Sequence, residues 1–154
     1  MRGFCTKHGE AKMYQKILVT LDHSGVDEAI LNHIEQLHQY ISSEVVLLHV
    51  ATGWAARHFN ELQLKESEEI REDRGYLARV EARLKKKGIT ATSFLAMGEP
   101  ADEIIKFAKE HQCDLIAMST HGHRFLGDLI YGATATKVRH QVDIPVLLLK
   151  ASKI

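Results

Sequence analysis

The sequence predicts an α/β domain in which a five-stranded parallel sheet is covered by helices on both faces. Short apolar runs alternate five times with segments of helical periodicity, and this order is typical of a doubly wound sandwich. The runs are almost continuously apolar, as strands covered on both faces should be. With 154 residues, of which 45% are apolar, the chain is long enough for one ordinary domain.

Order should begin after a flexible tail over residues 1–13, which mix glycine, lysine, glutamate and histidine without an apolar period. The single domain is then expected over 14–151. Its first strand is the run at 16–20, a turn follows at 21–25, and the apolar run 44–50 predicts the second strand. Between them, apolar residues at helical spacing predict a helix: Val26, Ile30, Ile34, Leu37 and Ile41.

The segment 51–59 is irregular and carries the only tryptophan, Trp54, which suits a lid over a ligand or a place in the core or in a dimer interface. A long charged helix with an apolar inner face is expected over 60–87. Gly88 should end this helix, because the C′ position favours left-handed backbone. Residues 89–97 alternate in polarity and predict the third strand.

The last third of the chain repeats the alternation. Pro100 should open a helix at its first turn, where Asp102 and Glu103 suit the positive end of the helix dipole. The fourth strand, the last helix and the fifth strand are expected at 114–118, 127–140 and 144–149.

A phosphate-binding loop is predicted between the fourth and fifth strands. Ser119-Thr120-His121-Gly122 follows a buried run, and after nine more residues comes Gly132-Ala133-Thr134. Glycines just past a strand and near a helix allow backbone N–H groups to approach an anion, which the helix dipole also favours. Open α/β sheets bind ligands at the carboxyl ends of their strands. We therefore expect a phosphate cradle at this edge.

Composition excludes several classes of protein. Lysine plus arginine and aspartate plus glutamate both number 20, so no overall field attracts nucleic acid or an anionic membrane. No apolar run approaches the ~20 residues of a membrane span, and no export segment opens the chain. Cys5 and Cys113 offer no disulfide framework, and the histidines are poorly spaced for a metal site. We expect a cytoplasmic protein that binds neither nucleic acid nor membrane.

Five blocks in this order resemble the universal stress protein family, and the likeness covers about residues 14–150. The nucleotide-binding members carry G-x-x-G, nine residues and then G-[ST] between strands four and five. Gly122 and Gly132 are in register with this motif, whereas Ser119 replaces its first glycine and Ala133 its final Ser/Thr. The other matches are the strand ending x-x-D-x-S, the second strand, the G-x-P before the third helix and the proline entry to the last strand, at 17–24, 47–50, 98–100 and 144–147.

The resemblance implies a Rossmann-like fold of the adenine nucleotide alpha hydrolase type and a bound adenine nucleotide, ATP or alternatively AMP, with or without Mg²⁺. Adenine would lie against the backbone of Val50 and the side of Thr20, and Asp22 would accept hydrogen bonds from the ribose hydroxyls. The backbone around the motif glycines would hold phosphate. The candidate nucleotide-binding residues are Thr20, Leu21, Asp22, Val50, Met118, Ser119, His121, Gly122, His123, Arg124, Gly132, Ala133 and Thr134.

Several of these residues have a second interpretation. Ser119 adds a Cβ where the backbone approaches the ligand. Ala133 lacks a hydroxyl that Thr134, one residue later, can supply. Asp22 either binds ribose, caps the helix that begins near Val26, or does both.

The loop residues and the function leave alternatives as well. His121 and Arg124 either donate to phosphate or lie in a solvated loop, and His123 is expected to be solvated. The resemblance implies a stress-response regulatory module with at most slow ATP hydrolysis. It also implies a homodimer formed through the final strand, which begins at Ile144 and ends at Leu149. The alternatives are an ATP-pyrophosphatase-type enzyme, for which residues 24–26 lack one of the two glycines of the loop, and a family member that binds no nucleotide and acts through protein contacts.

Overall fold

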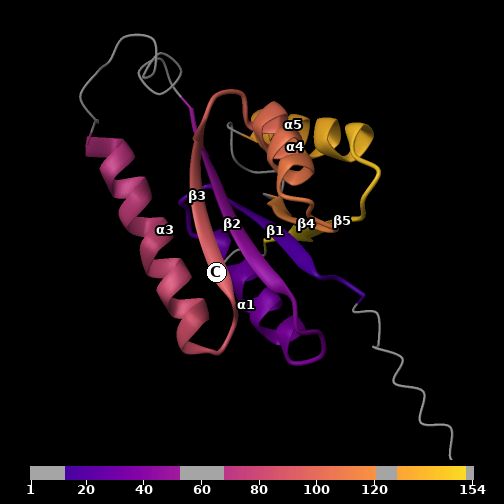
Figure 1. Ribbon diagram of the computed structural model, residues 1–154. Coiled ribbons are helices and arrows are strands. Elements are labelled where there is room, and N and C mark those ends of the chain that lie inside the picture. Colours follow the sequence, from indigo (N-terminus) through magenta and orange to yellow (C-terminus); the bar gives the residue numbers. More distant parts are fainter. Residues whose placement is uncertain (1–12, 53–67, 121–127, 152–154) are drawn as a thin grey trace, which may run out of the picture.

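The structure is a computed structural model and describes residues 13–52, 68–120 and 128–151 (Figure 1). In chain order its elements are β1 (Lys16–Leu21), α1 (Asp27–His38), β2 (Glu44–Ala51), α3 (Glu68–Lys86), β3 (Ala91–Met97), α4 (Pro100–Glu110), β4 (Leu115–Thr120), α5 (Asp128–Gln141) and β5 (Val146–Lys150). The five strands form one parallel sheet in the order β3-β2-β1-β4-β5. This sheet confirms the predicted fold class.

Helices cover both faces of the sheet, as Figure 1 shows, with α1 and α3 on one face and α4 and α5 on the other. The first face buries Val19 and Leu47 against α1 and α3. The second buries Leu18 and Leu48 against α4 and α5. Because successive side chains of a strand point to opposite faces, β1 and β2 each contribute to both cores. This double coverage explains why their sequences are almost continuously apolar.

The topological switch point of the sheet lies between β1 and β4. From β1 the chain moves outward through β2 to β3, and it then returns to the other side of β1 with β4 and β5. The pairing of β1 with β4 runs from Ile17 to Val19 on the first strand, although β1 continues to Leu21 and β4 to Thr120. The carboxyl ends of the two strands therefore extend beyond their ladder, at the place where open α/β sheets bind ligands.

Element boundaries differ from the predicted ones by a few residues, each for a physical reason. β4 continues to Thr120 and begins only after Asp114, whose carboxylate accepts two backbone N–H groups at the start of β1, at 2.7 and 3.0 Å. β5 begins at Val146, two residues later than predicted, because Pro145 before it has no N–H to donate to a ladder. The first helix ends at His38, before its predicted last apolar position.

The end of α3 and the start of α4 are as predicted. Gly88 has φ +78°, and the N–H of Ile89 donates to the carbonyl of Leu84 at 3.1 Å, which closes the helix end. Pro100 is the first residue of α4. The predicted tail up to residue 12, the predicted helix start at 60 and Trp54 lie outside the described residues. Within the part of the chain that the structure describes, no helix is long and apolar enough to cross a membrane.

Candidate functional site

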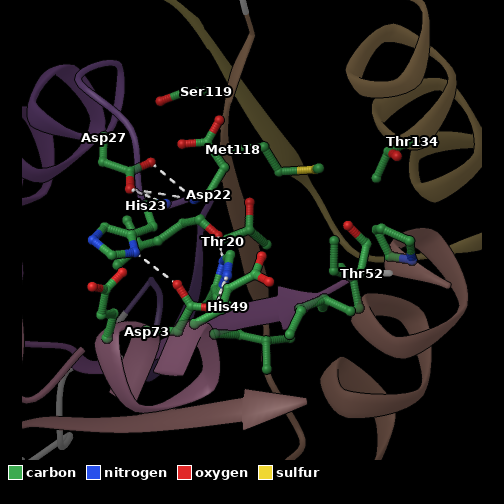
Figure 2. A pocket seen from close by; sticks show the side chains of 18 residues that line it. Thr20, Asp22, His23, Asp27, His49, Thr52, Asp73, Met118, Ser119 and Thr134 are labelled. Carbon is green, nitrogen blue, oxygen red and sulfur yellow. Dashed lines mark hydrogen bonds and ion pairs between the residues drawn. The ribbon is translucent and has the colours of Figure 1, made fainter. Parts of the chain in front are cut away.

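A cavity of about 400 Å³ opens at the carboxyl ends of β1, β2 and β4 (Figure 2). The strands and the residues directly after them contribute Thr20, Leu21, Asp22, His23, Leu48, His49, Val50, Ala51, Thr52, Met118 and Ser119 to its lining. The helices contribute Asp27, Glu69, Glu72, Asp73, Pro100, Ile104 and Thr134. The cavity therefore lies at the switch point of the sheet, where the strand order reverses.

This cavity brings together predicted nucleotide-binding residues from four parts of the chain: Thr20, Leu21, Asp22, Val50, Met118, Ser119 and Thr134. Gly132 and Ala133 are exposed on α5 and do not belong to the lining. Among the described residues, a Cβ added at Gly132 would meet no atom within 4 Å apart from its chain neighbours and the backbone of its own helix. Four predicted residues lie outside the described part of the chain: His121, Gly122, His123 and Arg124.

The carboxylate of Asp27 holds the backbone of the turn after β1. The Asp27 carboxylate accepts the backbone N–H of Asp22 at 3.1 Å and that of His23 at 2.9 Å. The N-cap of α1 is Val26, four residues beyond Asp22, and it makes no side-chain cap bond. The alternative in which Asp22 caps this helix is therefore wrong, because an N-cap side chain must lie within reach of the first helical N–H groups. Asp22 Oδ1 instead accepts the hydroxyl of Ser24 at 2.5 Å.

A buried carboxylate on α3 links the ends of β1 and β2. Oδ1 of Asp73 lies 2.7 Å from Nδ1 of His23, and its Oδ2 lies 3.3 Å from Nε2 of His49 (Figure 2). The other ring nitrogen of His49, Nδ1, lies 2.8 Å from the carbonyl oxygen of Leu21. Because a carbonyl oxygen only accepts hydrogen bonds, this Nδ1 carries a hydrogen. The three side chains thus form a continuous bridge from helix to strand ends.

One turn further along α3, Tyr76 makes a second contact with the same turn. Its hydroxyl donates to Oδ2 of Asp27 at 2.6 Å, and its ring stacks on that of His23 with centroids 4.3 Å apart. Burial raises the pKa of Asp27 to about 6, although the hydrogen bond from Tyr76 acts in the opposite direction. Burial and the bond to Asp27 also raise the pKa of Tyr76. The tyrosine therefore remains a hydrogen-bond donor throughout the physiological pH range.

The cavity is acidic on the side formed by α1 and α3. Carboxylates in its lining belong to Asp22, Asp27, Glu69, Glu72 and Asp73, and no lysine or arginine is among the described lining residues. On the opposite side, β4 and α5 present the neutral hydroxyls of Ser119 and Thr134. Carboxylates repel phosphate but accept hydrogen bonds from hydroxyl and amino groups. The lining thus favours an uncharged part of a ligand near α3 and an anionic part toward α5.

Most residues on this acidic side were not predicted from the sequence, although the positions of two of them in the sequence indicate a buried polar group. His49 is a polar residue within a buried apolar strand, an unusual position that indicates a specific partner. Asp73 precedes Leu77, Val80 and Leu84 at spacings of four, three and four, so it lies in register with the apolar face of its helix. A carboxylate in that register predicts a buried, partnered group. Within the described residues, no group of three or more His, Cys, Asp or Glu side chains could hold a metal ion.

Comparisons with known proteins were made against family models, curated sequences and solved structures. The model of the universal stress protein family matches residues 13–150. Universal stress protein MJ0577 of Methanocaldococcus jannaschii is 27% identical over 158 residues, which cover 90% of this chain and 96% of that protein. The solved structure of MJ0577 superposes with a TM-score of 0.75 and covers 92% of this chain and 99% of its own.

Two more distant structures share the fold. One is a universal stress protein of Archaeoglobus fulgidus in complex with dAMP, with 21% identity, a TM-score of 0.65 and coverage of 89% and 98% of the two chains. The other is a universal stress protein in complex with cAMP, with 17% identity, a TM-score of 0.65 and coverage of 90% and 98%. Since the family model spans the chain from before β1 to the end of β5, this protein belongs to the universal stress protein family.

Proposed function

We propose that the protein binds an adenine nucleotide, ATP or AMP, in the cavity at the switch point of the sheet, and acts in the cytoplasm as a stress-response regulatory module. The observation that carries this proposal is the cavity itself, which collects Thr20, Asp22, Val50 and Ser119 from strands far apart in sequence. Membership of the universal stress protein family supports it, and so do the fold relatives in complex with dAMP and cAMP.

The charge of the lining suggests how the nucleotide lies. Adenine and ribose carry no charge and fit the side formed by the ends of β1 and β2, with adenine along Val50 and the ribose hydroxyls donating to Asp22. The phosphates then extend away from the acidic residues of α3, toward Thr134 and the backbone near Gly132. Gly122 and Ala133 belong to the same proposed phosphate site, with His121 and Arg124 as further donors and His123 solvated.

The number of phosphates on the ligand distinguishes ATP from AMP. The ligands of the two fold relatives each carry one phosphate, whereas the described residues leave the surface at Gly132 open to a longer phosphate chain. Mg²⁺ would accompany ATP and not AMP, because it would neutralise part of the charge on a polyphosphate. Titration with both nucleotides, with and without Mg²⁺, separates these cases.

The test of the proposed site is the substitution Gly132→Val. A valine side chain would occupy the space through which phosphate approaches the backbone, so we expect calorimetry to show no binding of ATP or AMP. The fold should persist, because in the described part of the chain a Cβ at this position meets no atom within 4 Å beyond its neighbours and its own helix backbone. Thr136→Val, exposed one turn further along α5, is the matched control and should bind like the wild type. Unchanged affinity in Gly132→Val would place the phosphates elsewhere.

The same proposal includes a homodimer formed through β5. This strand is an edge of the sheet, and Leu148 on it is 40% exposed. An unpaired apolar edge is an aggregation hazard, which pairing with the same strand of a second copy would remove.

A further inference from the structure

We infer that Asp73 is a positioning residue for the nucleotide site, because it holds both neighbours of Asp22 in place through two histidines. The inference rests on the proposed function, since Asp22 is the residue proposed to bind ribose. Asp73 itself belongs to α3, 51 residues along the chain from Asp22. Its side chain also belongs to the lining of the cavity, and its proposed effect on the ligand is exerted through the turn that follows β1.

The first arm of the bridge reaches the residue after Asp22. Nδ1 of His23 lies 2.7 Å from Oδ1 of Asp73, and the imidazole stacks on Tyr76 of the same helix. The backbone of His23 has φ +61°, in the left-handed region that a non-glycine residue adopts at a cost. The side-chain contacts to α3 therefore hold a conformation that the turn would otherwise tend to leave.

The second arm reaches the residue before Asp22. Nε2 of His49 lies 3.3 Å from Oδ2 of Asp73, and Nδ1 of the same ring donates to the carbonyl of Leu21 at 2.8 Å. Leu21 is the last residue of β1, so its carbonyl lies beyond the part of the strand that pairs with β4. His49 supplies a side-chain donor for this carbonyl, and Asp73 keeps the ring oriented.

Burial makes the bridge depend on all its members. Asp73 is 6% exposed and His49 is 9% exposed, and a buried polar group without a partner is costly. Removing the carboxylate would take away the partner that both imidazoles share and release both neighbours of Asp22. Asp27 would still accept the N–H groups of the turn, so the turn would loosen without being lost.

The experiment compares Asp73→Ala with Asp73→Asn in the full chain. Asparagine keeps an oxygen acceptor for His23 Nδ1–H and turns an amide N–H toward Nε2 of His49, which accepts it when the ring carries its hydrogen on Nδ1 alone, so both contacts persist without the charge. By calorimetry we expect Asp73→Ala to weaken AMP binding about tenfold or more, and Asp73→Asn to remain within about threefold of the wild type. Recovery by asparagine is what a positioning role requires.

Val80→Ala is the matched control for stability, because Val80 is buried on the same face of α3, two turns from Asp73. It should lower the melting temperature while leaving AMP affinity within about threefold of the wild type. If Asp73→Ala binds AMP as well as Val80→Ala does, the inference is overturned. If Asp73→Ala does not fold, His23→Asn gives the same test, because asparagine tolerates positive φ but is too short to reach Asp73.

A second readout separates this inference from the proposed function. Hydrogen exchange of the Asp22 and His23 amides, measured without ligand, should be faster in Asp73→Ala than in Val80→Ala. If the wild type binds no adenine nucleotide, the proposed function fails, and the exchange rates alone decide whether Asp73 holds the turn. Equal exchange in the two variants would contradict the inference whatever the binding result.

Discussion

Ser119 and Thr134 face the cavity from β4 and α5, and their positions bear on the two departures from the family motif. The hydroxyl of Ser119 lies 3.4 Å from the carbonyl oxygen of Val26, so this side chain is accommodated against the start of α1. Ala133 is exposed on α5 outside the lining, whereas Thr134 is buried and belongs to it. Thr134 is therefore the residue of this pair that presents a hydroxyl to the cavity.

The raised pKa of Asp27 predicts how the stability of the protein depends on pH. Its pKa is raised from the ordinary 3.8 to about 6 in the folded protein, with burial as the largest cause. Its contribution to the free energy of unfolding is then fully present below pH 3.8 and is lost as the pH rises through 6. A shift of about two pKa units corresponds to about 3 kcal/mol.

The measurement compares urea unfolding of the wild type and Asp27→Asn, which cannot ionise, between about pH 4 and about pH 7. The free energy of unfolding of the wild type, relative to that of the variant, should fall as the pH rises across this range. Asp22, His23 and Tyr76 face the carboxylate and remain in both proteins, so their own titration largely cancels. A relative stability that rises with pH, or stays constant, would contradict the assignment.

At the scale of elements, β5 determines the proposed dimer. The N–H of Ile116 donates to the carbonyl of Pro145 at 3.1 Å, and the ladder pairs Ile116 with Val146. In a parallel ladder of this register the backbone N–H of Val146 points away from β4, toward the free edge. Val146→Pro therefore deletes a donor at the edge without removing a bond to β4.

We expect light scattering to show a dimer for the wild type at micromolar concentration, and a monomer or aggregate for Val146→Pro. Leu148→Lys should weaken the dimer as well, because it places a charge on the same exposed edge. Phe94→Lys on β3 is the matched control, since Phe94 is 38% exposed on the strand at the opposite edge of the sheet. A monomeric wild type would end the dimer proposal, and a dimer that survives both β5 substitutions would move the interface elsewhere.

At the scale of the whole molecule, the distribution of charge around the cavity predicts slow chemistry. Transfer of a phosphoryl group needs cationic groups that neutralise the charge developing on it. The described lining offers carboxylates and imidazoles but no lysine or arginine, and Arg124 is the single such residue in the proposed phosphate site. We therefore expect ATP turnover far below the roughly 10 per second of an ordinary enzyme.

Turnover is measured as release of phosphate and of AMP from ATP by the purified full chain. Ser24→Ala and Asp27→Asn are the informative variants, because Ser24 lies in the turn after β1 and Asp27 at the start of α1, in the segment that a pyrophosphatase-type enzyme would use. A steady rate near that of an ordinary enzyme, lost in these variants, would favour the pyrophosphatase alternative.

Much of the fold could be predicted because its evidence is local in the sequence. Apolar periodicity located the strands and helices, and single residues such as Gly88 and Pro100 marked where helices end and begin. The boundaries were less accurate where a distant group decides them. Asp114 precedes β4 because its carboxylate binds N–H groups at the start of β1, about a hundred residues earlier in the chain.

For the candidate site as well, the sequence and the tertiary structure determined different features. Sequence alone determined that a carboxylate and glycines follow two of the strands, because motif residues are neighbours in the chain. Only the tertiary structure decided which strand ends share a cavity, since the order β3-β2-β1-β4-β5 sets β1 beside β4. It alone also paired Asp73 with His23, 50 residues apart, because burial brings α3 onto the sheet and leaves that carboxylate no solvent to face.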